Sequence, residues 1–225
     1  MTFFSRLRLN PTRRETRRLV SSPQAMHAAV MGSHPLGSGP EEGRVLWRLD
    51  RQAPHDLELF VVSPSRPDFT GLVEQAGWPT IDTWDTTEYD GFLRQVSVGQ
   101  QWRFRLTANP VRATAVAEGR GAVRPHVTVA HQQEWLFSRA DSWGFAVLTT
   151  DEGSSSVAVR DRHTAQFHRS SQTTEGERRG RVSITRADFV GRLEVVDADR
   201  LRHALVHGMG RAKAYGCGLM TLARG

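Results

Sequence analysis

The chain has 225 residues, of which 38% are hydrophobic, and its 30 basic and 24 acidic side chains give a net charge of +6. No apolar run is long enough to cross a bilayer, the first residues lack a signal-peptide pattern, and the single cysteine excludes an internal disulfide. We therefore expect a cytoplasmic protein of one large or two small domains, rather than a membrane or secreted protein.

The elements expected in the first half of the chain alternate between strands and helices. Apolar and polar residues alternate in the strands, while Ser22 before Pro23 is typical of a helix start. In chain order we expect a strand at 3–9, helices at 13–20 and 23–31, strands at 45–49 and 57–62, a helix at 71–76 and a strand at 92–98. This order is that of a ferredoxin-like unit.

The second half repeats this pattern around an arginine-bearing insertion. In chain order we expect strands at 102–107, a helix at 132–140, strands at 145–148 and 156–160, a polar turn at 172–180, a strand at 189–196, a helix at 197–207 and a closing strand at 217–222. A boundary near Gly99 would divide domains 1–98 and 99–225. The fold class we predict is α+β, with two tandem ferredoxin-like domains.

The excess of arginine favours a phosphate-rich partner, because guanidinium groups pair with phosphates and stack on bases. Lys213 is the only lysine among the 30 basic residues. A composition that otherwise uses arginine and keeps this one residue suggests that an ammonium group is needed here. The alternative is that a GC-rich genome favours arginine codons over lysine codons. The basic surface would then be merely solvated, and Lys213 would be retained by chance.

Lys213 and Arg211 lie in a glycine-rich segment that would let a polyanion approach the main chain. Its four glycines are Gly208, Gly210, Gly216 and Gly218. A dinucleotide loop follows a strand and opens a helix, whereas this segment follows a helix and precedes the last expected strand. An RNA backbone therefore fits this segment better than a nucleotide cofactor, and we expect no cofactor.

His27 is the histidine best placed for acid–base chemistry. On the expected helix it lies at the edge of the inward-facing stripe that contains Met26 and Val30. Gln24 is one turn earlier on the same face and could orient the imidazole. The alternative is a half-exposed helical histidine without a catalytic task.

Two further groups of residues are candidates, one for RNA binding and one for metal binding. The arginines of the insertion could form a two-stranded ribbon that follows a phosphate backbone, or a flexible basic loop. They include Arg160, Arg162, Arg169, Arg178 and Arg179. His203 and His207 have the spacing of two metal ligands, but no third ligand completes the site, so we expect no metal.

The chain resembles the CasE family of CRISPR repeat-processing endoribonucleases, from the subtype I-E systems. The resemblance covers nearly the whole length. It depends on GMGRAKAYGCGL at 208–219, RFRLTANP at 103–110, GRLEVVD at 191–197 and Met26-His27 on the early helix. The first two segments together are highly specific.

The resemblance implies two RAMP-type (RRM-like) domains with an RNA-binding groove between them. It also implies metal-independent cleavage at the 3′ base of a CRISPR repeat hairpin, with His27 as the catalytic histidine and the product kept in the type I-E Cascade complex with its other subunits. Some family members have a tyrosine three residues before this histidine, where this chain has Gln24. The alternatives are a non-catalytic subunit that binds structured RNA on the same fold, and a metal-dependent nuclease that uses His203 and His207.

Overall fold

The computed structural model describes residues 1–35, 44–78, 80, 84–114, 122–150, 153, 155–173 and 176–225. At 52, 114, 122, 168–173 and 176–181 it describes the backbone alone. No helix in these ranges is long and apolar enough to span a bilayer.

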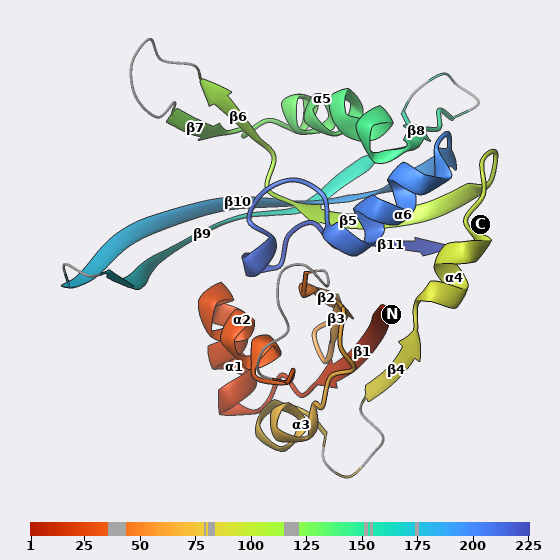
Figure 1. The fold of residues 1–225 in the computed structure, drawn as a ribbon. Coiled ribbons are helices and arrows are strands. Elements are labelled where there is room, and N and C mark those ends of the chain that lie inside the picture. Colours follow the sequence, from red (N-terminus) through yellow and green to blue (C-terminus); the bar gives the residue numbers. More distant parts are fainter. Residues whose placement is uncertain are drawn as a thin grey trace.

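The first unit is an antiparallel sheet with helices on one face (Figure 1). Its strands are β1 (Phe3–Leu9), β2 (Leu46–Ala53), β3 (Asp56–Ser63) and β4 (Trp84–Glu88), in the order β2-β3-β1-β4. Its helices are α1 (Arg14–Ser21), α2 (Pro23–Met31) and α3 (Thr70–Ala76). Alternate residues such as Leu7 and Leu9 of β1 pack against the helices, as a half-buried strand requires.

The second unit repeats this order of strands. Its sheet runs β11 (Met220–Ala223), β5 (Gln101–Ala108), β10 (Gly176–Val195) and β8 (Phe145–Val147), and β9 (Ala158–Thr173) pairs with β10. The helices α5 (Val129–Ala140) and α6 (Ala198–His207) contribute Trp135, Leu136, Leu201 and Leu205 to its core. The expected α+β class with two ferredoxin-like units is therefore confirmed.

The arginine-bearing insertion is a two-stranded ribbon, as one of the two interpretations predicted. β9 and β10 pair continuously from Thr173 and Gly176 back to Thr164 and Thr185, and the ribbon projects beyond the rest of the second unit (Figure 1). The turn expected at 172–180 is wrong, because residues 172–173 and 176–180 belong to the strands. The five consecutive β9 residues from Arg160 to Thr164 are all exposed, so the alternation that marks a half-buried strand is missing from this part of the sequence.

Other expectations at the end of each unit are also corrected. Residues 90–95 form the helix α4 (Asp90–Gln95), not the strand expected at 92–98, and the fourth strand is β4. Leu93 and Val96 are buried three residues apart, which is a helical spacing. The closing strand begins at Met220 rather than Cys217, and the hairpin of β6 (Val111–Thr114) and β7 (Ala122–Pro125) was not expected.

The two units are joined through the face of the first sheet that carries no helix. Leu46 and Val62 on that face belong to the core of the second unit. On the same face, two residues after Leu46, Arg48 has an almost fully buried side chain whose guanidinium reaches the second sheet. Residues of both units contribute to one core, so packing does not separate the units at a single position. The domain boundary between residues 98 and 99 therefore stays a prediction.

Candidate active site

The helix α2 presents His27 at the edge of its buried face. Ser22 caps the helix by accepting a hydrogen bond from the Ala25 amide at 3.2 Å, and Pro23 occupies the first turn. Met26 is buried, and His27 beside it is half-buried. Burial lowers the pKa of His27 below its ordinary value of 6.5, because a desolvated imidazole resists protonation.

One nitrogen of the His27 imidazole has no partner among the residues that the structure describes. This atom, Nδ1, is buried. Gln24, half-buried one turn earlier, forms no hydrogen bond with His27 among the described residues, so the orienting contact considered for it is absent from this structure. An unpaired buried nitrogen is costly, and a catalytic role is one explanation for such an atom.

The glycine-rich segment between α6 and β11 lies against the first unit (Figure 1). Gly208, Gly210, Gly216 and Gly218 all have positive φ, between +77° and +92°. A Cβ at Gly216 would lie 2.6 Å from the ring of Trp47, and one at Gly208 would lie 2.7 Å from Leu46. The glycines therefore let this segment pass close to β2 in a conformation that other residues rarely adopt.

The main-chain amides of this segment are partly engaged within the protein. The Gly218 amide donates to the Thr107 carbonyl at 2.7 Å, and the Gly208 amide donates to the Ala204 carbonyl at 2.9 Å. In the structure, the amides of Gly208 and Gly218 are therefore used within the protein. The sequence had suggested that a polyanion could approach such amides. Arg211, within the same segment, is exposed.

Lys213 begins the short helix η3 (Lys213–Tyr215), which packs against α2 and β2. Trp47 of β2 donates its indole N–H to the Ala214 carbonyl at 3.3 Å. The Lys213 ammonium donates to the His207 carbonyl at 2.8 Å, and burial, followed by the charge of Arg44, lowers its pKa. The structure thus places the helix of His27 beside the element that carries Lys213.

The ribbon arginines are exposed where the structure describes them. Arg160 and Arg162 point to solvent, and Arg162 donates to the Val127 carbonyl at 3.1 Å. The side chains of Arg169, Arg178 and Arg179 lie outside the described residues.

A buried ion network between the units was missed by the sequence analysis. Arg48 forms a bidentate pair with Asp50 at 2.8 and 2.9 Å, and donates to the carbonyls of Arg105 and Leu219 in the second unit. Arg105 in turn bridges Asp50 at 3.2 Å and Asp188 at 2.7 Å. Arg48 and Asp50 lie two residues apart on one strand face, which was the available signal. The network therefore joins β2 of the first unit to β5 and β10 of the second unit.

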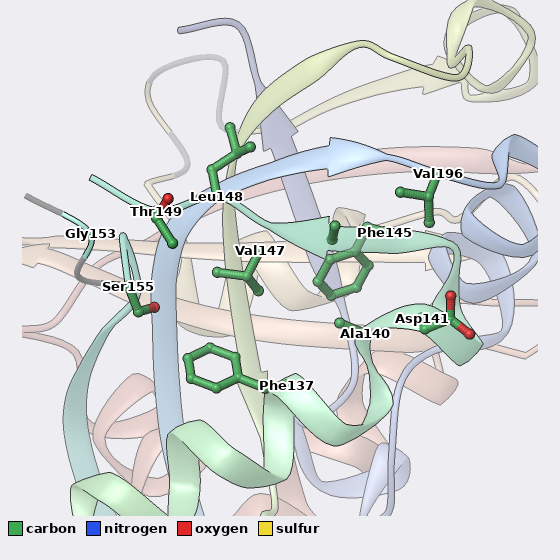
Figure 2. Close-up of a pocket in the computed structure, with 11 residues that line it drawn as sticks. Phe137, Ala140, Asp141, Phe145, Val147, Leu148, Thr149, Gly153, Ser155 and Val196 are labelled. Atoms are coloured by element: carbon green, nitrogen blue, oxygen red, sulfur yellow. The ribbon is translucent and has the colours of Figure 1, made fainter. Parts of the chain in front are cut away.

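Beside this network lies a cavity of about 290 Å³ between the two units. A larger cavity, of about 570 Å³, lies at the edge strand β8 and is lined by apolar residues such as Phe137 and Val147 (Figure 2). Its lining comes from the α5–β8 region and from Val196, not from the elements around His27.

The histidine pair His203 and His207 stacks ring on ring, with centroids 4.0 Å apart. Among the described residues, no group of three or more His, Cys, Asp or Glu side chains is arranged to hold a metal ion.

The comparisons with known proteins agree with this arrangement. The family model described as "CRISPR associated protein" matches residues 2–224. A curated protein of Thermus thermophilus, CRISPR-associated endoribonuclease Cse3, is 32% identical over 225 residues, which cover 98% of this chain and 99% of that protein.

Two solved structures share the fold. Thermus thermophilus Cse3 bound to an RNA representing a pre-cleavage complex matches with a TM-score of 0.75 and 28% identity, over 99% of this chain and 98% of that chain. The CRISPR-associated protein Cas6e of Escherichia coli matches over 100% of both chains with a TM-score of 0.57, and its 20% identity shows the fold alone.

Proposed function

This chain belongs to the CasE family of CRISPR-associated proteins, and on that premise we propose that it is an endoribonuclease that cleaves CRISPR repeat RNA at the 3′ base of the hairpin. The relative named an endoribonuclease spans the whole chain, and a solved relative is bound to RNA in a pre-cleavage complex. The observation that carries the proposal is the position of His27 on α2, beside the segment that contains Lys213.

His27 acts as the general base in the proposed reaction. Its lowered pKa keeps the imidazole neutral near pH 7, so that it can remove the proton of the ribose 2′-OH. The 2′ oxygen then attacks the adjacent phosphorus, the bond to the 5′ oxygen breaks, and the leaving 5′ oxygen takes up a proton from water. The products are a 2′,3′-cyclic phosphate upstream and a 5′-OH on the mature RNA, and no metal takes part.

Lys213 stabilises the negative charge that develops on the phosphorane. An ammonium has three N–H donors, and one of them is used by the His207 carbonyl. The other donors remain for phosphate oxygens, and such charge stabilisation needs no proton transfer. Gln24 positions the ribose or phosphate. The helix α2 and the glycine-rich segment together hold the 2′ oxygen in line with the bond that breaks.

The ribbon and the exposed Arg211 bind the RNA backbone. Arg160 and Arg162 are exposed on a ribbon that projects beyond the sheet, where a phosphate backbone has access. Arg169, Arg178 and Arg179 extend the same cationic sequence along the ribbon. We expect the protein to keep its product and to hold it with the other subunits of the type I-E Cascade complex.

The test is cleavage of a repeat hairpin RNA in EDTA by the wild type and by a His27→Ala variant. We expect the wild type to produce a 2′,3′-cyclic phosphate end and the variant to lose about 10²–10⁴-fold in the single-turnover rate while still binding the hairpin. His55→Ala, at an exposed turn position, is the matched control. Undiminished cleavage by His27→Ala would exclude His27 as the base, and a wild type that binds without cutting would support the binding-only alternative.

A further inference from the structure

The cavity between the two units has the size of a single nucleotide. It lies among α1, α2, β2 and the base of the β9–β10 ribbon, and its volume is about 290 Å³. Ligand sites commonly begin at about 300 Å³, so this space suits one small unit rather than a helix or a peptide. Two of its lining residues, Pro23 and Met26, come from the helix that carries His27.

The lining of the cavity combines apolar and cationic side chains. Pro23, Met26 and Leu49 form part of the apolar lining. The lining also includes Arg51 and Arg186, whose side chains form no hydrogen bond or ion pair with another described residue. The combination suits a nucleotide, whose base is a flat apolar surface and whose phosphate is an anion.

The other charged groups in the cavity are largely compensated. Arg105 is held by Asp50 and Asp188, and Asp50 also pairs with Arg48, so two guanidiniums face two carboxylates in this network. His163 and Asp161 complete the polar lining and are exposed. The cations left for a ligand are therefore Arg51 and Arg186.

The backbone of the ribbon is distorted at the cavity. Asp161 has a φ of +45°, which is rare for a residue other than glycine. The pairing of β9 with β10 shifts between Arg186 and Asp188, so that Asp161 and Arg162 face the single residue Ala187. Such bulges redirect side chains and occur often beside functional sites. Here the bulge lies where the ribbon turns polar side chains toward the cavity.

We propose that this cavity binds one unpaired ribonucleotide that flanks the base of the RNA hairpin. The base lies against the apolar lining, and its phosphate lies between Arg51 and Arg186. Because the apolar lining includes residues of α2, the captured nucleotide lies close to the bond that His27 acts on. The inference rests on the proposed function and adds to it a pocket for single-stranded RNA beside the duplex-binding ribbon.

The experiment measures the affinity for hairpin RNAs that carry a 2′-deoxy substitution at the cleavage site and so cannot be cut. Four RNAs are compared: a blunt stem, stems with unpaired nucleotides on the 5′ side or the 3′ side, and the better of these with an abasic residue next to the stem. We expect the wild type to bind one flanked RNA about tenfold more tightly than the blunt or abasic RNA.

An Arg51→Gln/Arg186→Gln double variant should lose this preference and keep its affinity for the blunt stem. The matched control is Arg66→Gln/Arg94→Gln, which removes the same charge from two exposed arginines outside the cavity. A Val20→Phe variant, which fills the apolar side without changing charge, should also lose the preference. A 4-thiouridine placed next to the stem should form a photo-crosslink to peptides of α2 or β2.

Equal affinity of the wild type for all four RNAs would overturn the inference, as would equal weakening of every RNA in the Arg51→Gln/Arg186→Gln variant. In either case the wild type would still cleave the natural repeat. Failure of the proposed function is different, because the wild type would then cut no hairpin at all.

Discussion

The two walls of the candidate site are built in different ways. The wall formed by α2 depends on local signals, the Ser22 cap and Pro23, and it leaves the His27 Nδ1 atom without a partner among the described residues. The wall formed by the glycine-rich segment depends on distant residues, since Gly216 lies on Trp47 and Gly208 lies on Leu46, while Lys213 donates to the nearby His207 carbonyl. One wall therefore holds a titratable group whose Nδ1 atom is unpaired in the described part of the chain, and the other holds a cation fixed in place by packing. This difference suggests that α2 supplies the chemistry and that the segment supplies position and charge.

Replacing Lys213 should produce the largest effect on the second wall. Lys213→Ala should lower the single-turnover cleavage rate by about 10²–10³-fold, because it removes a donor aimed at developing charge. Lys213→Arg should recover only part of the rate, since a planar guanidinium does not present its donors as an ammonium does. Rates and dissociation constants are measured with the same repeat hairpin. A change in the dissociation constant alone, without a change in the rate, would show that Lys213 only binds the RNA backbone.

The packing of the segment is tested by paired glycine substitutions. Gly216 and Gly99 have nearly the same φ, +80° and +82°, but a Cβ at Gly99 would meet nothing within 4 Å. Gly99→Ala should cost about 1–2 kcal/mol of unfolding free energy from backbone strain. Gly216→Ala should cost about 1–3 kcal/mol more, because the methyl group collides with Trp47. Urea unfolding measures both, and equal losses would mean that Trp47 does not fix the segment.

The pH dependence of cleavage tests the first wall and should show the smallest effect. As a base, His27 must be neutral, and its pKa lies below 6.5 in the free protein. The value of kcat/KM should therefore be near its plateau at pH 7 and fall by about tenfold per pH unit below the pKa of His27. The measurement covers pH 5 to 8 in EDTA. A rate that rises on acidification would instead assign His27 the role of the acid.

Much of the architecture was predictable because it follows from short-range rules. The helix expected at 23–31 has the same bounds in the structure, since capping and proline placement act within one turn. The strand expected at 102–107 was marked by alternating apolar residues and forms the centre of the second sheet. The resemblance to the CasE family was also visible in the sequence, and the family is confirmed.

The failures came where short-range patterns were ambiguous or absent. The segment at 92–98 is too short to separate the two periods, and in the structure Phe92 of the helix α4 packs edge-on against Trp102. The β9 residues from Arg160 to Thr164 are all exposed and show no alternation, so the length of the ribbon strands was underestimated. The residues that line the cavity between the units come from seven elements far apart in the sequence, so no sequence motif predicts the cavity.

The sequence by itself determined the family, the ferredoxin-like order of the main strands and helices without α4 and the β6–β7 hairpin, and the position of His27 at the edge of a buried helix face. Only the tertiary structure decided that Arg48 would be buried between the units, that the glycines would lie on Leu46 and Trp47, and that α2 would stand beside Lys213. The physical reason is range. Caps and periodicity act over a few residues, whereas a buried guanidinium is tolerated only where distant carboxylates and carbonyls satisfy it.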